Sequence, residues 1–401
     1  MDDETVRAEM RSAAGLGVEL FVLDAGWGPG PTSTSDSSTG LGLWTVDARR
    51  FPAGLGPLGD YARSLGMKFG VWVEPERVDT ATVNRAGLAR ERFLATTGGR
   101  YNSGVKNENA GAAQICLGDA EARQWVLGQL VRFIDEVRPD YLKWDNNYWI
   151  NCDRTSHGHG TQDGNYAHVR GLYAVLDKVR ARYPDLTIEN CSGGGNRLDL
   201  GMLQYTDAGW MDDVSGPSAH VRRNLQGLGT VFPVRYLLSF VMDDPSEPIH
   251  RAADLPLYFR SRMAGVLGVS LVGTEFGEDE LADMAREIAL YKHLRDAGPD
   301  PVLALLTDQV DETAGASWDA VQLSTREIGS GVVFAFRGSG ADAHMRIRPI
   351  NLWPGVFYQL STPRGRALDR VDGAALMEDG VEVGGWPYSA AQVVIFTPIG
   401  Q

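Results

Sequence analysis

The segment YLKWDNN, residues 141–147, places a lysine and a carboxylate two positions apart at the end of an apolar run. In an extended strand Lys143 and Asp145 point to the same side, so the cation would favour the ionised form of Asp145. An ionised carboxylate can act as a nucleophile, and a lysine beside it can bind hydroxyl groups. A plain salt bridge at a strand end is the alternative, and this segment alone does not decide between the two.

Other polar residues end apolar segments within the first 213 residues of the chain. They are accompanied by tryptophans, and the combined set is Asp24, Glu74, Glu76, Asn190, Cys191, Asp212 and Asp213 with Trp27, Trp44, Trp72, Trp144 and Trp210. Carboxylates beside indoles suit a carbohydrate, because sugar C–H faces stack on aromatic rings while hydroxyl groups bind charged side chains. Two carboxyl groups that flank a glycosidic bond can hydrolyse it. Taken singly, a tryptophan is more often a core residue, and WMDD could equally be a helix cap or a cation site.

The sequence argues against a metal site. The segment HGHG at 157–160 places two histidines in a loop with no third ligand at helical spacing. The three cysteines, Cys116, Cys152 and Cys191, are too few and too scattered for a disulfide framework or a zinc cluster. We therefore expect no metal site.

A repeated pattern predicts the elements that position these residues. Seven apolar segments alternate with amphipathic helical stretches, and they cover residues 19–27, 68–76, 140–147, 186–195, 205–213, 234–244 and 265–276. Residues 119–140 and 166–184 repeat apolar side chains at helix spacing, with Asp119 as a plausible N-cap of the first. Alternating strands and helices imply a parallel sheet.

Seven strands over about 280 residues favour a (β/α)8 barrel, with an α/β doubly wound sheet as the alternative. The doubly wound sheet would normally carry a Gly-rich phosphate loop after its first strand, whereas CSGGGN comes late and lacks that spacing. We expect a catalytic barrel at residues 1–302, with the polar strand ends on one face. The chain opens in a helix-like segment, so we also expect the first strand to be missing and the chain to be a fragment.

The pattern changes from about residue 303. Short β-rich segments follow one another with no helix between them, at residues 321–329, 331–338, 345–352, 355–363 and 392–399. They predict a small antiparallel β-sandwich domain at 303–401. Residues 28–42, GPGPTSTSDSSTGLG, lie between ordered elements and predict a long surface loop.

Composition limits the partners. The formal net charge of -14 argues against nucleic acid and anionic membranes. No run of about 18 apolar residues predicts a membrane span, and the N-terminus lacks the pattern of a signal peptide. Together with the few cysteines, this favours a cytoplasmic protein with no nucleic-acid or membrane partner.

The order of the motifs resembles glycoside hydrolase family 36, the bacterial α-galactosidases that share a clan with family 27. The resemblance covers roughly residues 15–300 and rests on ELFVLDAGWG, GLGPLGDYARSLGMKFGVWVEPERV, DYLKWDNN, IENCSGGGNRLDLGML and GWMDDVS. It implies a retaining exo-α-glycosidase, most simply an α-galactosidase acting on terminal α-linked galactose in an oligosaccharide or glycoside. It implies no metal or organic cofactor. Members of the family are often oligomers, which leaves a homo-oligomer open.

Carried over position by position, the resemblance implies that Asp145 is the nucleophile and Asp213, three residues after Trp210, the general acid/base. Their carboxyl groups would then stand about 5–5.5 Å apart. Lys143 and Asp24 would bind ring hydroxyl groups. The remaining substrate contacts are expected from Cys191 and Gly194 near O2 and from Trp27, Trp72, Trp144, Trp210 and Asp212.

Three departures from the family pattern keep alternatives open. Ala25 stands where the family usually has a second aspartate, and Asp212-Asp213-Val214-Ser215 replaces Ser-Asp-Asn-Thr-Asp, which makes Asp212 a rival acid. We also expect the family's N-terminal β-sandwich to be absent. The alternatives are an α-N-acetylgalactosaminidase, another α-glycosidase or transglycosylase of the clan, an inactive carbohydrate-binding barrel, and a metal-dependent barrel hydrolase.

Overall fold

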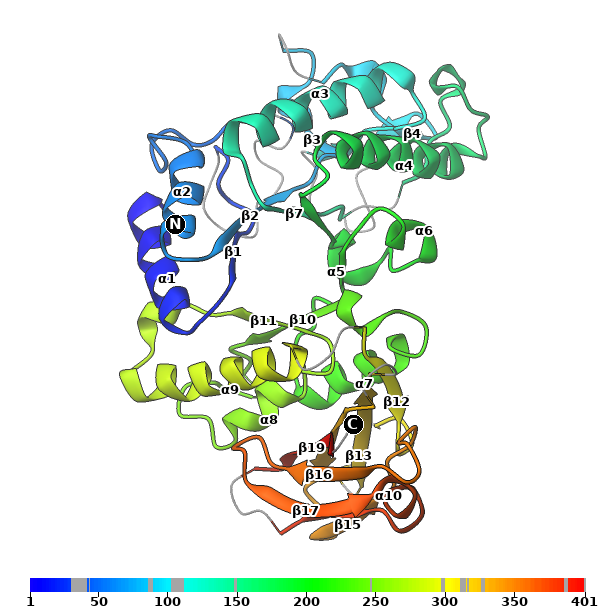
Figure 1. Ribbon diagram of the computed structural model, residues 1–401. Helices are drawn as coiled ribbons and strands as arrows, with labels where there is room; N and C mark the ends of the chain where they lie inside the picture. The colour runs from blue at the N-terminus through cyan, green and yellow to red at the C-terminus, as the bar shows by residue number, and fades with distance from the viewer. Residues whose placement is uncertain are drawn as a thin grey trace. The chain divides into compact units, whose positions relative to one another are not determined.

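The computed structural model describes most of the chain in two compact units, Met1–Trp210 and Met211–Gln401 (Figure 1). The described residues are 1–29, 42, 44–85, 89–101, 112–147, 150–245, 247–296, 300–310, 315, 317–325, 329–385 and 389–399. The surface loop predicted at 28–42 lies almost wholly outside them.

Five parallel strands form the sheet of the first unit. In sheet order they are β1 (Leu20–Leu23), β2 (Lys68–Val73), β7 (Tyr141–Trp144), β8 (Thr187–Asn190) and β9 (Ala208–Trp210). Val73 pairs with Trp144 and Trp144 pairs with Asn190, so the carboxyl ends of β2, β7 and β8 lie level with one another. β2 and β7 are buried almost throughout, as expected of parallel strands covered on both faces.

One helix precedes the first strand of this unit, and the others follow strands along the chain. They are α1 (Asp3–Gly15), α2 (Gly56–Ser64), α3 (Ala120–Val137), α4 (Gly164–Arg182) and the short α5 (Ser192–Gly195) and α6 (Leu200–Leu203). The prediction for α3 is confirmed, since the Asp119 side chain caps it by accepting from the Ala122 backbone N–H and its apolar face is buried. α3 and α4 pack side by side (Figure 1). Short strand pairs lie in the loop between β2 and α3, namely β3 (Arg77–Asp79) with β6 (Ala112–Gln114) and β4 (Thr96–Thr97) with β5 (Arg100–Tyr101).

The second unit begins with two more parallel strands, β10 (Leu237–Met242) and β11 (Val266–Ser270), which pair with each other. Its helices are α7 (Ser218–Leu228), α8 (Leu255–Arg260) and α9 (Glu278–Asp296). All seven predicted strands are therefore present, and each is followed by a helix. This alternation is that of the (β/α)8 fold, as the sequence predicts.

The rest of the second unit is antiparallel, which confirms the predicted C-terminal β domain. One sheet has six strands in the order β12 (Val302–Leu305), β13 (Trp318–Ser324), β14 (Gly331–Arg337), β19 (Ala391–Ile399), β16 (Phe357–Ser361) and β17 (Ala367–Asp372), and a second pairs β15 (His344–Ile347) with β18 (Val381–Gly384). Side chains of both sheets share one apolar core. The domain boundary at 302/303 stays a prediction.

The expectation that no helix interrupts these strands is wrong. A short helix, α10 (Gly373–Asp379), separates β17 from β18. The Asp372 side chain starts it by accepting hydrogen bonds from the backbone N–H groups of Ala374 and Ala375. A helix of seven residues is too short to show a clear apolar period in the sequence.

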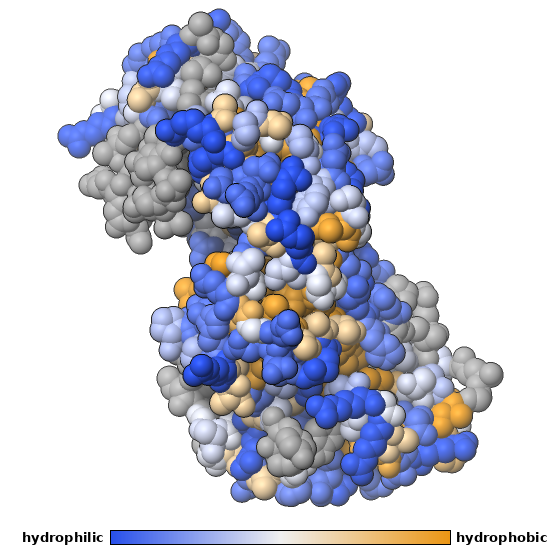
Figure 2. All heavy atoms as spheres, turned by 90° about the vertical axis from the view of Figure 1, so that its left-hand side faces the viewer, coloured by the Kyte–Doolittle hydropathy of each residue, from blue (hydrophilic) through white to orange (hydrophobic). Residues whose placement is uncertain are grey.

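Hydrophilic side chains cover most of the face shown in Figure 2, in keeping with the acidic composition. Among the described residues, no helix has the length and apolar content needed to cross a membrane.

Candidate active site

The predicted polar residues of the first unit follow the carboxyl ends of neighbouring strands. Asp24 follows β1, Glu74 and Glu76 follow β2, Asp145 follows β7, and Cys191 follows β8. Because these strands are parallel and in register, their ends open on the same edge of the sheet. This edge is where active sites of (β/α)8 enzymes lie.

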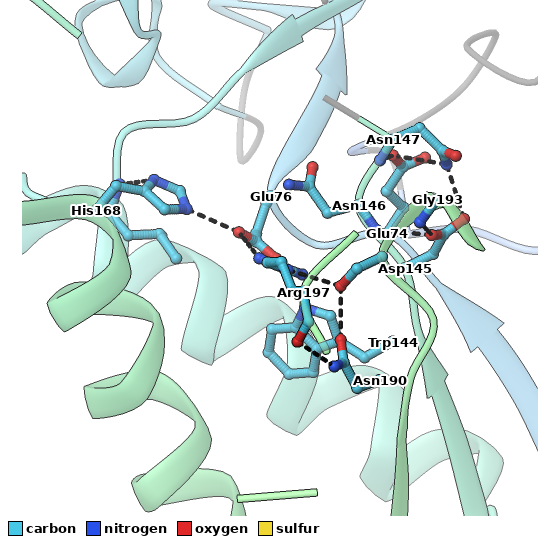
Figure 3. A network of polar contacts seen from close by, with 12 residues as sticks. Glu74, Glu76, Trp144, Asp145, Asn146, Asn147, His168, Asn190, Gly193 and Arg197 are labelled. Carbon is cyan, nitrogen blue, oxygen red and sulfur yellow. Dashed lines mark hydrogen bonds and ion pairs between the residues drawn. The ribbon is translucent and has the colours of Figure 1, made fainter. Parts of the chain in front are cut away.

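Four hydrogen bonds hold the carboxylate of Asp145, two on each oxygen, and Figure 3 shows those from Asn147 and Gly193. Oδ1 accepts from the backbone N–H groups of Asn146 at 2.8 Å and Gly193 at 2.7 Å. Oδ2 accepts from Trp72 Nε1 at 3.1 Å and Asn147 Nδ2 at 2.7 Å. Every partner is a donor, which matches the acceptor-only chemistry of an ionised carboxylate. The side chain is oriented from three strand ends and is almost buried, with 6% of its surface exposed.

The CSGGG segment supplies one of these donors. Gly193 has φ 60° and ψ 39°, in the left-handed region, and this turn aims its N–H at Asp145. A Cβ at this position would lie 3.1 Å from Asn196 Nδ2 and 3.2 Å from Asn147 Oδ1. The glycine is therefore required both by the backbone conformation and by the close approach of the asparagines.

Lys143 forms an ion pair with Asp24, at 2.7 Å between Nζ and Oδ2. Its ammonium also lies 5.5 Å from the ring centre of Trp210. Burial opposes the charge, but the carboxylates of Asp24 and Glu189 raise the pKa of Lys143 above its ordinary value. The lysine is therefore a permanent cation next to an exposed carboxylate, while the hydrogen bonds on Asp145 come from other donors.

Glu74 lies beside Asp145 and shares a donor with it. Asn147 Nδ2 donates to Glu74 Oε1 at 3.1 Å as well as to Asp145, and the Asn147 backbone N–H adds a bond of 2.8 Å to Glu74 (Figure 3). Complete burial raises the pKa of Glu74 to about 7, although its buried ion pair with Arg77 opposes this shift and the charge of Asp145 adds to it.

Glu76, two residues further on, has the opposite character. Burial again opposes ionisation, but the Arg197 guanidinium and a hydrogen bond from His168 lower the pKa of Glu76 to about 2. Arg197 contacts both carboxylate oxygens at 2.9 and 3.0 Å, and the indole of Trp144 donates to Oε1 at 2.9 Å. Arg197 Nε also donates to Ser192 Oγ at 2.6 Å. Glu76 therefore ties the CSGGG segment to the end of β2 through permanent charges.

The other predicted substrate contacts of this unit differ in accessibility. Trp144 is fully buried and its polar atom is used by Glu76, so its side chain lies in the core. Trp27 donates from Nε1 to the carbonyl oxygen of Trp72 and stacks on Phe133. Cys191 is buried directly after β8, and Gly194 follows in the left-handed conformation with its surface partly exposed.

Asp212 and Asp213 belong to the second unit. Asp212 Oδ2 accepts from His220 Nε2 at 2.7 Å and Asn224 Nδ2 at 3.0 Å, both on α7. Its Oδ1 accepts from the Val214 backbone N–H at 2.9 Å. Asp213 is exposed. Asp212 is therefore used to attach the loop to α7, whereas Asp213 faces solvent.

Sequence reasoning missed several residues of the site. Asn147 and Gly193 hold the carboxylate, and the environment of Glu74 and Glu76 depends on Arg77, His168 and Arg197. The sequence signal for Asn147, Gly193 and Arg77 is their position at the end of a predicted strand, inside CSGGG or directly after a predicted strand. Arg197 follows CSGGG by two residues and His168 lies in the predicted helix at 166–184, so neither carries such a signal. The structure also brings together two of the cysteines and both histidines of HGHG, so the expectation that the cysteines are scattered is wrong for Cys116 and Cys152.

Comparison with known proteins places this geometry in a family. The family model described as Melibiase matches residues 1–298. Alpha-galactosidase Mel36A of Lactobacillus acidophilus is 32% identical over 300 residues, which are 74% of this chain and 39% of Mel36A. Alpha-galactosidase AgaA of Geobacillus stearothermophilus is 31% identical over 301 residues, 73% of this chain and 39% of AgaA. The chain thus spans about two fifths of the length of these relatives.

Solved structures support the fold. The crystal structure of the GH36 alpha-galactosidase AgaA from Geobacillus stearothermophilus superposes with a TM-score of 0.84 at 24% identity, over 100% of this chain and 54% of AgaA. An AgaA variant in complex with raffinose gives a TM-score of 0.83 at 23% identity, over 100% of this chain and 54% of that one. These likenesses confirm the predicted barrel and C-terminal β domain. The chain belongs to the Melibiase family, and the predicted resemblance to glycoside hydrolase family 36 is confirmed.

Proposed function

We propose that the chain carries the catalytic site of a retaining exo-α-glycosidase that removes terminal α-linked galactose from oligosaccharides. The observation that carries this proposal is the carboxylate of Asp145, which is fixed by four donors at the end of a barrel strand. A nucleophile needs a carboxylate that is ionised and held in one orientation.

In the first step, an oxygen of Asp145 attacks the anomeric carbon while the bond to the leaving oxygen breaks. Asp213 donates its proton to that oxygen, which leaves as an alcohol, and a covalent glycosyl-enzyme forms. In the second step, Asp213 takes a proton from water as the water oxygen attacks the same carbon and releases Asp145. Two displacements retain the anomeric configuration, and the separation of about 5–5.5 Å between the two carboxyl groups stays a prediction.

Asp213 suits the acid/base role better than Asp212. Asp212 accepts three hydrogen bonds, from His220, Asn224 and Val214, and protonation would weaken them. Asp213 is exposed, so a substrate oxygen and then a water molecule can reach it. A group that acts first as an acid and then as a base must exchange one partner for another in this way.

The ion pair of Lys143 with Asp24 supports a sugar as the ligand. The ammonium supplies donors and the 56% exposed Asp24 side chain supplies acceptors. A sugar hydroxyl can donate to the carboxylate and accept from the ammonium at the same time. Galactose is favoured because the matching relatives are α-galactosidases, and a variant of one of them was crystallised with the oligosaccharide raffinose. A homo-oligomer and a cytoplasmic location stay predictions.

Hydrolysis of three aryl glycosides tests the proposal. The chain and its Asp145→Ala variant are compared on 4-nitrophenyl α-galactoside, α-N-acetylgalactosaminide and α-glucoside. We expect turnover of the galactoside that is lost in the variant. NMR should show α-galactose as the sugar released first, because a retaining mechanism keeps the anomeric configuration, and β-galactose released first would contradict retention. Turnover of only the N-acetylgalactosaminide would mean that the sugar is N-acetylgalactosamine and not galactose. A folded chain that turns over none of the three substrates would favour the alternative of an inactive carbohydrate-binding barrel.

A further inference from the structure

Four metal-ligating side chains of the first unit lie close together. They are Cys116, Cys152, His157 and His159, and one ligand atom from each lies within 4.8 Å of the others. All four are buried, with 0%, 0%, 2% and 9% of their surfaces exposed. The active-site chemistry proposed above uses none of them.

The distances match a tetrahedral site. Cys116 Sγ lies 3.4 Å from His159 Nε2, and Cys152 Sγ lies 3.4 Å from His157 Nδ1. With zinc bonds of about 2.3 Å to sulfur and about 2.0–2.1 Å to nitrogen, the sulfur–nitrogen edge of a tetrahedron is about 3.5 Å. The side chains therefore already stand about as far apart as they would around a zinc ion.

In each histidine, the ring nitrogen that faces away from the cluster (the outer nitrogen) determines whether the nitrogen that faces the cluster (the inner nitrogen) carries a proton. His157 Nε2 lies 2.6 Å from the carbonyl oxygen of Arg92, and His159 Nδ1 lies 2.6 Å from that of Gly160. A carbonyl oxygen only accepts, so each outer nitrogen carries the proton and each inner nitrogen of the neutral ring presents a lone pair to the cluster. Histidines that bind metals are oriented in this way by their outer nitrogen.

We propose that these residues bind one Zn²⁺ ion in a closed Cys₂His₂ site. Two thiols lose their protons to solvent on binding, and the two thiolates balance the charge of the ion, so the buried site is neutral overall. Mixed sulfur and nitrogen ligands in a tetrahedral arrangement suit zinc, and four protein ligands leave no position for water or substrate. The site is therefore structural.

The ion would join two loops that also carry the active site. Cys116 lies in the loop between β2 and α3, which begins with Glu74. Cys152, His157 and His159 lie in the loop between β7 and α4, which begins with Asp145. Gly118 makes room for the arrangement, because a Cβ there would lie 2.8 Å from His159 Cδ2. Zinc would thus hold together the loops that follow the two central carboxylates.

Two other states could use the same side chains. Each cysteine could stay a thiol that donates to its histidine, or Cys116 and Cys152 could form a disulfide. The measurement is the metal content of the full chain, expressed with zinc in the medium, purified under reducing conditions and desalted, by inductively coupled plasma mass spectrometry. We expect about one zinc ion per chain, as four protein ligands close one site.

Matched variants locate the ion. Cys152→Ser and His157→Ala should lose most of the zinc. Two control variants should keep it, namely Cys191→Ser, which removes the buried cysteine outside the cluster, and His344→Ala, which removes an exposed histidine at the start of β15. Zinc that persists in both ligand variants would overturn the proposal. A wild-type chain without zinc would also overturn it. So would a disulfide between Cys116 and Cys152, which mass spectrometry of the unreduced chain would show as a loss of two hydrogen atoms and as one linked peptide that contains both cysteines.

Two measurements on the wild-type chain test the proposal even if the ligand variants fail to fold. Titration with an organomercurial in the presence of a zinc-sensitive dye should release the ion in step with modification of the cysteines. Replacement of zinc by Co²⁺ should give thiolate-to-cobalt charge-transfer absorption and the intense visible bands of a tetrahedral site. No zinc release, or the weak visible bands of an octahedral ion, would contradict the proposal. An inactive chain with one zinc ion would still support it.

Discussion

The first unit holds two buried polar clusters that follow the same pair of strands but are built from different chemistry. Around Asp145, hard carboxylate oxygens accept hydrogen bonds from indole, amide and backbone donors. Around Cys116 and Cys152, sulfur and imidazole nitrogen face one another at 3.4 Å. In the proposals above, the first cluster supplies the nucleophile, and the second supplies four ligands to an ion that would stabilise the loops. The comparison separates residues whose loss should affect catalysis from residues whose loss should affect stability.

The largest effect is expected from Asp145→Ala. Removal of the proposed nucleophile should lower kcat/KM for an aryl α-galactoside by at least about 10³-fold, because the proposed covalent intermediate forms on this carboxylate. The thermal midpoint should change little. Cys152→Ser is the contrasting variant, and its main effect should be a lower thermal midpoint. Substantial activity in Asp145→Ala would remove the nucleophile assignment, and equal thermal midpoints of the two variants would break the comparison.

The next effect concerns the acid/base residue. Asp213→Ala should lower kcat/KM by about 10²–10⁴-fold for substrates with poor leaving groups, since these need protonation. The loss should be much smaller for aryl glycosides with acidic leaving groups. Kinetics over a series of leaving groups measures this dependence. The matched variant Asp212→Ala should instead weaken the attachment of its loop to α7, and a steep leaving-group dependence in that variant would exchange the two roles.

A smaller effect is expected from Lys143→Met. A hydrogen bond from a charged donor contributes about 1.5–3 kcal/mol, so kcat/KM should fall by about 10- to 100-fold. Lys178→Met, on the exposed side of α4, serves as the control for the loss of a positive charge. Steady-state kinetics compares the two, and similar values for both would reduce Lys143 to a structural ion pair with Asp24.

The smallest effect is a pH dependence that differs between Glu74 and Glu76. The pKa of Glu74 is raised from 4.5 to about 7, so its stabilisation is complete below pH 4.5 and is lost as pH rises through about 7. The pKa of Glu76 is lowered to about 2, so its stabilisation is present above pH 4.5 and is lost as pH falls through about 2.

Urea unfolding between pH 5 and 8 tests this difference. Glu74→Gln should remove part of the fall in the free energy of unfolding, on the order of 2 kcal/mol across this window. Glu189, whose pKa is also raised to about 7 by burial, contributes with the same sign and remains in the variant. Glu76→Gln should lower stability without changing the slope in this range. A flat wild-type profile would show that Glu74 stays ionised in the folded state.

Much of this protein could be predicted from its sequence because the signals are local. Seven apolar segments that alternate with amphipathic stretches predict the parallel strands, and Asp119 predicts the start of α3. Asp145 and Lys143 could be located because the end of a parallel strand always opens on the same edge of the sheet. Local composition also predicts the C-terminal β domain, although the seven residues of α10 are too few to show a helical period.

The tertiary structure decided what depends on residues far apart in the chain. Glu74 and Glu76 look alike in the sequence, but burial raises the pKa of Glu74, whereas Arg197 and His168 overcome the effect of burial and lower the pKa of Glu76. Cys116 and His159 are 43 positions apart, so no spacing motif connects them. Periodicity along the chain determines which elements form, whereas folding determines which side chains share a buried environment, and the charge and ligand chemistry of this protein follow from the latter.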